Sequence, residues 1–340
     1  MQANPILVQT IRGNWVENRH RGAMVLADAE GQIVASLGDT DWPVFPRSAI
    51  KSMQALAMVG AGAIERFALS DEDLALACAS HHGETDHVAG VTRFLGEIGL
   101  AADALECGAH APTNPAARSA LRAAGEEPSA LHNNCSGKHA GMLSVARALG
   151  VPPEHYVDPD HPVQQRVRAA VETVLGVALT TERCGTDGCS IPTYAAPLSA
   201  FAGGFARMAT GQGLSPELGA AAMRLFDAAT SHPHLVAGTG HFDTLVMEAF
   251  GGRVMQKGGA EGVQCGAIRD LGLGYAIKCD DGNMAASQAM AAGLLLAVAR
   301  PDAKQTALLQ RYARQIITNV RRREVGMMAV TDAVFEAFGC

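Results

Sequence analysis

The chain has 340 residues, 48% of them hydrophobic, and its formal net charge at pH 7 is −7. A chain of this length and composition can bury a substantial core, as one large domain or as two closely packed ones. It contains no stripe of Lys and Arg and no nucleic-acid-binding motif, which argues against a polyanionic partner. We expect the one basic run, residues 321–323, to lie on the solvated face of a helix.

The first predicted elements are strands. Apolar runs at residues 6–17 and 22–36 are typical of strands, and residues 28–32 have the composition of a hairpin turn. A helix should begin near Ser48, shortly after a proline. Alanine-rich helical segments then alternate with loops rich in Gly and Pro. The further predicted helices are residues 70–77, 86–98, 116–124, 137–149, 162–175, 194–209 and 216–231.

Strand signals return after residue 241. The predicted strands are residues 244–250, 253–256, 263–269 and 274–278, and two helices at 283–299 and 303–319 follow them. This order indicates an α+β fold: an antiparallel sheet built from both chain ends, flanked by helices, with a large helical insertion. We expect one catalytic unit over residues 1–340. Its sheet-containing subdomain would be 1–60 plus 236–340 and its helical subdomain 61–235, with a site in the crevice shared by both.

The lack of an export signal and the use of cysteine indicate the cellular compartment. Residues 1–10 lack the charged and apolar regions of an export signal, and the most apolar segment, 284–299, is too short and polar to span a membrane. We therefore expect a cytoplasmic protein with no membrane partner. Eight cysteines are many for such a chain, but a disulfide framework is not expected at this length, and most should be buried.

The helix predicted near Ser48 carries a possible nucleophile and its base. Ser48 and Lys51 are three residues apart, so on a helix they lie on one face. A hydroxyl needs a base before it attacks a carbonyl, and a desolvated neutral lysine can serve. The alternative is a capping serine with a solvated lysine. Only five of the 27 basic residues are lysines, which suggests that those in turn-rich sequence, such as Lys51, are retained for their amine.

A second lysine motif follows a predicted strand. Lys257 precedes two glycines, which let backbone approach a substrate closely. A turn lysine between strands is the alternative. Together with Ser-x-x-Lys far upstream, this motif resembles the arrangement of penicillin-recognising enzymes, in which a Ser-x-x-Lys helix faces a Lys-x-Gly strand. The helical-loop Ser-Asp-Asn of those enzymes is missing, and Ser80 is the nearest candidate for the third polar element.

Three segments carry metal-ligand side chains. His81, His82 and His87 could hold an ion, but the polar residues between them more simply cap the following helix. Cys135 and Lys138 share a helix face, and a Gly-rich turn can present Cys189 inward. Two thiolates with an amine suit zinc better than hard cations. From spacing alone, a zinc site and buried free cysteines both remain open.

Five ordered motifs, read together, resemble the rhizobial-type L-asparaginases, the third structural class of that activity. The motifs are Pro-Arg-Ser-Ala-Ile-Lys-Ser around Ser48, Cys-Ala-Ser-His-His-Gly-Glu around Ser80, His-Asn-Asn-Cys-Ser-Gly-Lys-His-Ala-Gly-Met around Cys135, Cys-Gly-Thr-Asp-Gly-Cys ending at Cys189, and Lys-Gly-Gly-Ala-Glu-Gly from Lys257. The similarity runs from about residue 7 to the C-terminus. Relatives by fold are the serine β-lactamases, penicillin-binding proteins and glutaminases.

The resemblance implies a role for each matching residue. Ser48 with Lys51, and Ser80 with Lys257, would be two Ser-Lys pairs around one carboxamide. The family's zinc ligands match Cys135, Lys138 and Cys189, and polar groups around its site match Arg47, His139 and Asp187. By charge, Asp187 could take a substrate ammonium and Arg47 or His139 its α-carboxylate. The resemblance also suggests a homodimer.

We therefore expect an L-asparagine amidohydrolase that works by acyl transfer. A neutral Lys51 would take the Ser48 proton, and Ser48 would attack the side-chain carboxamide. Zinc would shape and polarise the pocket without supplying the nucleophile. One alternative is a glutaminase or another amide or ester hydrolase of this fold. Another, from a different class, is a zinc-dependent binding or regulatory protein.

Overall fold

The computed structural model describes residues 3–339, which form two compact units. Unit 1 is Met1–Ala49, Ala196–Ala206 and Gln256–Cys340, and unit 2 is Ile50–Ala195 and Arg207–Met255. Residues 50–60 and 236–255, which we expected in the sheet-containing part, fall in unit 2. Both segments are mainly helical there, with α1 (Lys51–Gly60) in the first and α11 (Phe242–Phe250) in the second, and these helices pack with other helices.

Unit 1 contains an eight-stranded antiparallel sheet. Its strands come from both chain ends, as predicted, in the order β11-β12-β1-β2-β10-β9-β8, with β3 paired to β2. The strands are β1 Ile6–Arg12, β2 Trp15–Ala27, β3 Ile33–Leu37, β8 Val254–Gly259, β9 Val263–Ile268, β10 Leu273–Cys279, β11 Arg314–Thr318 and β12 Glu324–Val330. Every residue of β8 and β9 is buried, so these strands are covered on both faces.

Helices cover both faces of the sheet at β10. A Cβ on Gly274 would lie 2.1 Å from the Ala202 carbonyl oxygen, so helix α8 (Leu198–Thr210) packs directly on this strand. Ile277, three residues further, points to the opposite face. Its cross-strand partner Gln264 donates a 3.0 Å hydrogen bond to Ser287 of α12 (Met284–Val298), which covers that face. The α+β fold class is thereby confirmed.

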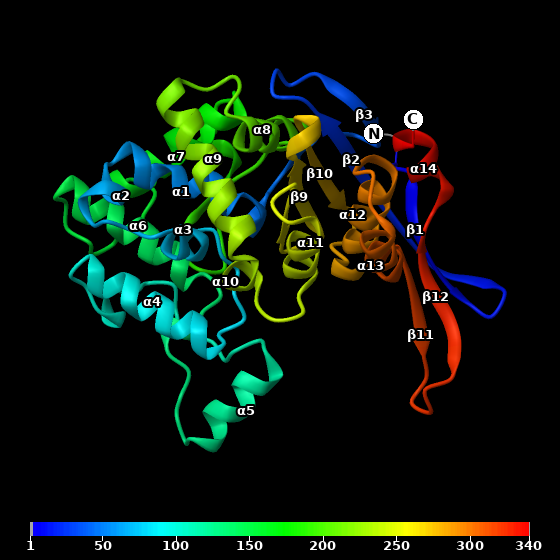
Figure 1. Cartoon of the computed structure of the whole chain (residues 1–340), viewed down its shortest axis with the longest axis horizontal. Coiled ribbons are helices and arrows are strands. Elements are labelled where there is room, and N and C mark those ends of the chain that lie inside the picture. The colour runs from blue at the N-terminus through cyan, green and yellow to red at the C-terminus, as the bar shows by residue number, and fades with distance from the viewer. Residues whose placement is uncertain (1–2, 340) are drawn as a thin grey trace. The chain divides into compact units, whose positions relative to one another are not determined.

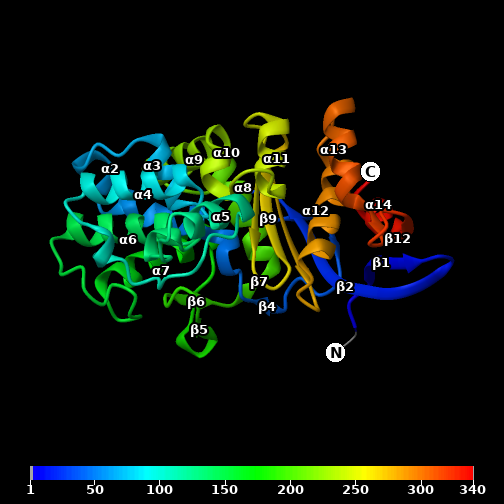
Figure 2. The same ribbon diagram turned by 90° about the horizontal axis from the view of Figure 1, so that it is seen from below.

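Short elements complete unit 1. Helices α13 and α14 pack on α12, and Figures 1 and 2 show them beside β11 and β12. Their bounds are α13 Ala303–Ala313 and α14 Asp332–Phe338, and the remaining elements are β4 Pro43–Val44, β7 Ala196–Pro197 and the 3₁₀ turns η1 Arg47–Ile50 and η5 Arg269–Leu271.

Unit 2 is mainly helical. Its central helix is α1, in which every residue from Lys51 to Met58 is buried, and it packs against α6, α7 and α9. The helices are α1 Lys51–Gly60, α2 Ala63–Arg66, α3 Asp71–Ala77, α4 Thr85–Glu97, α5 Pro115–Ala123, α6 Ser136–Leu149, α7 Pro162–Leu175, α9 Pro216–Ser231, α10 Pro233–Ala237 and α11 Phe242–Phe250. A hairpin, β5 Cys184–Thr186 and β6 Pro192–Tyr194, and the 3₁₀ turns η2 Ala102–Ala104, η3 Ala130–His132 and η4 Thr181–Arg183 connect them.

Three predictions of local structure were wrong. Residues 244–250 belong to helix α11, because buried Phe242, Val246 and Phe250 recur every four residues. The predicted helix 303–319 ends at 313, and 314–318 form strand β11. The basic run 321–323 lies in the turn between β11 and β12 instead of on a helix, because pairing of these two strands places it at the hairpin end. Between residues 3 and 339, no helix combines the length and apolar character needed to cross a bilayer.

Candidate active site

In unit 2, a buried lysine contacts a serine. The side chain of Lys51 is fully buried, and its Nζ donates to Ser80 Oγ at 2.8 Å. It also donates to the backbone carbonyl oxygens of Ala79 and, at 3.4 Å, of Asn134. Burial lowers the pKa of Lys51, because an ammonium loses its hydration there. The amine is thus suited to accept a proton, and a hydroxyl lies within reach.

Hydrogen bonds hold the segment that carries Ser80. The segment leaves α3 after residue 77, and the Ser80 backbone N–H donates to the Val236 carbonyl at 2.8 Å. The next residue, His81, is buried, and its Nε2 lies 2.9 Å from Ser136 Oγ. Burial holds the pKa of His81 well below its usual value, so this ring is neutral. Ser80 is therefore fixed by neighbours on three different elements.

In unit 1, Ser48 lies on a tight turn. It is the second residue of the 3₁₀ turn Arg47–Ile50 and is half-buried. Arg47 has a φ of 52°, a left-handed conformation that few non-glycine residues adopt. Such backbone strain is concentrated at functional sites. The predicted helix thus begins as a 3₁₀ turn, and the α-helix starts at Lys51.

The end of strand β8 packs against the Ser48 turn. Lys257, on this strand, is 1% exposed, and its Nζ donates to the Gly258 carbonyl at 2.8 Å. A Cβ on Gly259 would lie 2.6 Å from the Pro46 carbonyl oxygen and 3.0 Å from the Ala49 nitrogen. Only glycine allows this approach. Unit 1 therefore brings the Lys257-Gly-Gly strand end beside the turn that carries the predicted nucleophile.

The two units divide the four predicted catalytic residues between them. Ser48 and Lys257 belong to unit 1, whereas Lys51 and Ser80 belong to unit 2. Ser48 and Lys51 are three residues apart where the chain passes from one unit to the other. The pairing of Ser48 with Lys51, and that of Ser80 with Lys257, stay predictions.

The three predicted zinc ligands lie together in unit 2. Cys135 precedes α6, Lys138 lies in its first turn, and Cys189 comes from the turn between β5 and β6. Lys138 Nζ donates to Cys189 Sγ at 3.0 Å. A hydrogen bond from the Cys189 thiol lowers the pKa of Cys135 well below its usual value and raises that of Cys189. Burial would lower the pKa of Lys138, but the nearby thiolate charge raises it instead.

The residues predicted to bind substrate come from both units. His139 is fully buried, its Nδ1 lies 2.5 Å from the Tyr156 hydroxyl, and its buried Nε2 has no hydrogen-bond partner among residues 3–339. Asp187 is half-buried, accepts a bond from the Gly188 N–H at 2.8 Å, and its charge helps to raise the pKa of Lys138. Arg47 lies in unit 1. Their roles toward substrate remain predictions.

Two residues near these groups were not predicted. The carbonyl of Asn134 accepts from Lys51, and the Tyr156 hydroxyl contacts His139. Asn134 lies in the dense polar run ahead of α6, so its position in the sequence could have indicated that it belongs to the site. Tyr156 lies in a loop 17 residues after His139, and nothing in the sequence pattern links the two.

Two further groups could supply metal ligands. Glu84, His87 and His234 have ligand atoms within 4.8 Å of one another, as do His20, Cys279 and Asp281. In the first group, the His87 Nδ1 accepts from the Glu84 N–H and the Glu84 carboxylate accepts from Thr239. The helix-capping interpretation of this histidine-rich segment is thus confirmed. In the second group, Asp281 accepts from the Cys279 thiol at 3.0 Å and pairs with His20 at 2.7 Å.

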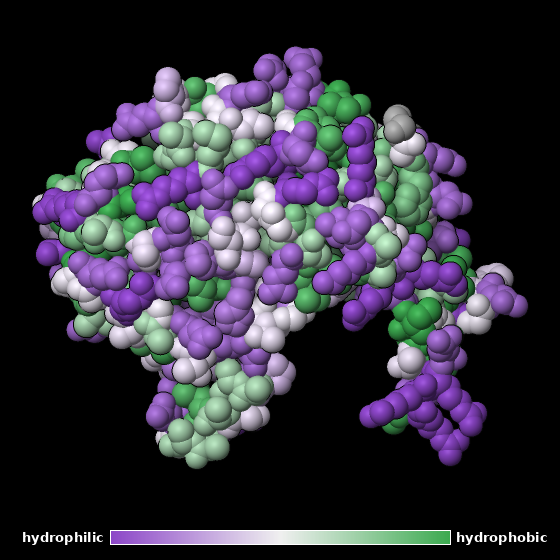
Figure 3. All heavy atoms as spheres, viewed as in Figure 1, coloured by the Kyte–Doolittle hydropathy of each residue, from purple (hydrophilic) through white to green (hydrophobic). Residues whose placement is uncertain are grey.

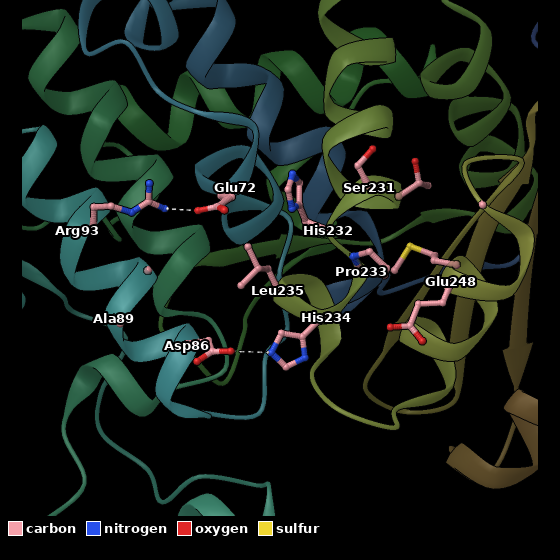
Figure 4. Close-up of a pocket in the computed structure, with 14 residues that line it drawn as sticks. Glu72, Asp86, Ala89, Arg93, Ser231, His232, Pro233, His234, Leu235 and Glu248 are labelled. Atoms are coloured by element: carbon pink, nitrogen blue, oxygen red, sulfur yellow. Dashed lines mark hydrogen bonds and ion pairs between the residues drawn. The ribbon is translucent and has the colours of Figure 1, made fainter.

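A cavity of about 800 Å³ opens in unit 2 away from these residues. Figure 4 shows its polar lining, in which Arg93 pairs with Glu72 at 3.2 Å and His234 faces Asp86 at 3.5 Å. None of the predicted site residues lines it. The cavity does border the segment that holds Ser80, because its wall residue Leu235 directly precedes the Val236 carbonyl.

Comparison with known proteins defines the class. A family model described as L-asparaginase II matches residues 8–330, nearly the whole chain. The protein is therefore an enzyme of the amidohydrolase class. It belongs to the L-asparaginase II family, as the five motifs implied.

The similarity to solved structures is more distant. A β-lactamase from Mycobacterium bovis, Mb2281c, is 15% identical with a TM-score of 0.40, covering 78% of this chain and 89% of that chain. The protein Mglu is 15% identical with a TM-score of 0.42, and the match covers 78% of this chain and 62% of that chain. The simvastatin synthase LovD of Aspergillus terreus is 13% identical with a TM-score of 0.41, and the match covers 76% of this chain and 86% of that chain. No curated protein sequence matches the chain.

Proposed function

We propose that the protein hydrolyses L-asparagine to L-aspartate and ammonia by acyl transfer to a serine. Family membership supports the amide substrate. The observation that carries the chemistry is the buried Lys51 amine, 2.8 Å from a serine hydroxyl and with a lowered pKa. A surface lysine would stay protonated at neutral pH and could not serve as a base.

In this mechanism the Lys51 amine takes the proton of Ser48, and the Ser48 oxygen attacks the side-chain amide carbon. The tetrahedral intermediate collapses as the C–N bond breaks. The leaving nitrogen receives a proton relayed from the Lys51 ammonium through the Ser80 hydroxyl to which it is hydrogen-bonded, and departs as ammonia. Water then attacks the acyl-serine, releases aspartate and restores the hydroxyl. Lys257, which the resemblance pairs with Ser80, would assist the same relay.

We also propose that Cys135, Lys138 and Cys189 hold a zinc ion. The donor set fits, because two buried thiols and an amine already contact one another and nitrogen and sulfur are the donors that zinc prefers. Binding requires Lys138 and Cys189 to lose protons, as metal ligands generally do. The bound ion would act as a Lewis acid that polarises the pocket.

The substrate's own charges suggest the remaining contacts. The Asp187 carboxylate, close enough to Lys138 to affect its pKa, would accept the α-ammonium of asparagine. Arg47 or the unpartnered Nε2 of buried His139 would bind the α-carboxylate. A buried polar atom without a protein partner is costly, and a substrate oxygen would satisfy it.

Initial rates of ammonia release test this proposal. We expect turnover of asparagine well above that of glutamine, and no hydrolysis of a chromogenic β-lactam. Preference for glutamine or the lactam would instead indicate another amide hydrolase of this fold. Absence of ammonia from every substrate, with and without zinc, would favour a binding or regulatory protein.

A matched pair of variants locates the nucleophile. Ser48→Ala should abolish ammonia release. Ser52→Ala, one turn further along, removes a buried hydroxyl that has no hydrogen-bond partner among the described residues and should leave the rate unchanged. Near-normal turnover by Ser48→Ala would move the nucleophile elsewhere, with Ser80 the first candidate.

A further inference from the structure

The hydroxyl of Tyr156 forms hydrogen bonds with two groups of unit 2. It accepts from the Glu106 backbone N–H at 3.0 Å, and it lies 2.5 Å from His139 Nδ1. Tyr156 and His139 are both fully buried. Polar residues are spread over the surface seen in Figure 3, where water can bind them. The buried pair must instead find its hydrogen bonds inside the protein.

The loop that carries Tyr156 is held in place from both sides. Residues 150–161 connect α6 to α7, and His155 in this loop has a φ of 60°, a left-handed conformation that few non-glycine residues adopt. The His155 N–H donates to the Glu106 carboxylate at 2.8 Å, and the Gln164 side chain donates to the Tyr156 carbonyl at 2.9 Å. Glu106 thus binds the loop twice, through its carboxylate and through its own N–H. Strained backbone of this kind persists where its surroundings fix it.

A count of protons gives the tautomer of His139. A phenol oxygen carries one proton and two lone pairs, and a backbone N–H can only donate. Among the described residues, His139 Nδ1 is therefore the one acceptor bonded to the Tyr156 hydroxyl, whose proton it receives. Nδ1 is then unprotonated, and the ring proton lies on Nε2. Any ring with a proton on Nδ1 would leave the buried phenol proton without an acceptor, which is costly.

The His139 Nε2–H is thus a fixed donor near the candidate site. Nε2 is buried and has no hydrogen-bond partner in the part of the chain that the structure describes. Burial lowers the pKa of His139 most, and the charges of Lys138 and Lys51 lower it further, so the ring lies near both amines. An unpartnered buried donor destabilises the free protein, and an oxygen of a bound ligand would remove that cost.

We propose that Tyr156 is a positioning residue that holds His139 in the Nε2–H tautomer, as a donor to the α-carboxylate of asparagine. A ring fixed in this form binds an oxygen acceptor, but its free nitrogen lone pair is already bonded to Tyr156 and cannot accept from the α-ammonium. The contact would therefore distinguish the two charged groups of the amino acid. Because the acceptor belongs to the substrate, this role rests on the proposed function.

The tautomer can be measured without substrate. In protein labelled with ¹⁵N at histidine, NMR distinguishes a protonated ring nitrogen from an unprotonated one by its chemical shift. The signals that disappear in His139→Gln belong to His139. We expect them to show a protonated Nε2 and an unprotonated Nδ1, and to move toward a mixture of tautomers in Tyr156→Phe. A proton on Nδ1 in the unmodified protein, or an unchanged tautomer in Tyr156→Phe, would overturn the proposal.

Two amides that differ only in the α-carboxylate test the contact itself. β-Alaninamide is asparagine without this group. Tyr156→Phe should lower kcat/KM for asparagine by about two- to tenfold, the value of one neutral hydrogen bond, through a higher KM. It should leave kcat/KM for β-alaninamide unchanged. Ser144→Ala is the matched control, because it removes another buried hydroxyl of unit 2, which donates to the Gly141 carbonyl at 2.7 Å, and it should change neither value.

The outcomes separate this role from a structural one. Equal losses with both amides would mean that Tyr156 only supports the fold, and a lower kcat for asparagine at unchanged KM would place its effect on the reacting amide; either result would overturn the proposal. Failure of the unmodified enzyme to release ammonia from asparagine would refute the proposed function instead. Calorimetry with aspartate would then decide the role of Tyr156: we expect Tyr156→Phe to bind it two- to tenfold more weakly, and equal affinities would contradict the contact.

Discussion

Replacing Gly259 by alanine tests whether close packing of the β8 end on the Ser48 turn is needed for catalysis. The added Cβ would lie 2.6 Å from the Pro46 carbonyl oxygen, a distance that real Cβ atoms essentially never show. Reaching 3.0 Å requires a shift of at least 0.4 Å, and the second contact, to the Ala49 nitrogen at 3.0 Å, blocks an easy escape. Both obstacles are backbone atoms, so no side chain can rotate away.

The shift has two expected consequences. Overpacking of this kind costs about 1–3 kcal/mol of unfolding free energy. Because the strand also carries Lys257 and the turn carries Ser48, the displacement should lower kcat by about ten- to a hundred-fold. Urea denaturation and ammonia release would measure the two effects. Gly60→Ala is the control, since a Cβ there meets nothing within 4 Å. A Gly259→Ala variant with normal kcat and normal stability would refute this account of the strand end.

Three further predictions concern the lysine, the metal and pH. Lys51→Met should keep the fold and lower kcat by about 10²–10⁴-fold, the usual contribution of a general base, whereas Lys304→Met, at an exposed position, should leave kcat unchanged. Cys189→Ser should bind no zinc by elemental analysis, while Cys184→Ser, in the same hairpin, should retain one ion per chain; equal zinc contents would contradict the proposed ligands. Burial lowers the pKa of His82 to about 4, so between about pH 6.5 and 4 the unfolded chain binds more protons and stability falls as the pH falls. Since His82 is half-buried, its share is roughly 1–2 kcal/mol after allowance for solvent screening, and His82→Asn should flatten the urea-midpoint profile in this window; an unchanged profile would contradict it.

The general fold could be predicted because local patterns agreed with it. Strand signals at both chain ends and helix signals between them gave the α+β arrangement with an antiparallel sheet. Where apolar residues are dense, their spacing does not distinguish a helix from a strand. Residues 244–250 contain strand-forming residues, yet they belong to helix α11. His241 directly precedes this helix and caps it by accepting from the Asp243 N–H. Strand β11 directly follows helix α13 and forms a hairpin with β12, and the sequence pattern extended the helix through it.

Sequence motifs likewise predicted only part of the candidate site. Motifs identified the residues, and the structure brings Cys135, Lys138 and Cys189 together from segments about fifty residues apart. Motifs did not identify which hydroxyl contacts Lys51. That contact, with Ser80, depends on how α3 packs against α1 and not on helical spacing.

The most direct test of the central claim is to trap the acyl-enzyme. Rapid acid quenching of the enzyme during asparagine turnover, followed by peptide mass spectrometry, would locate the acyl group. We expect one aspartyl group on the peptide containing Ser48, and none in Ser48→Ala. An aspartyl group on another residue, or no adduct at any quench time despite rapid turnover in both proteins, would contradict it.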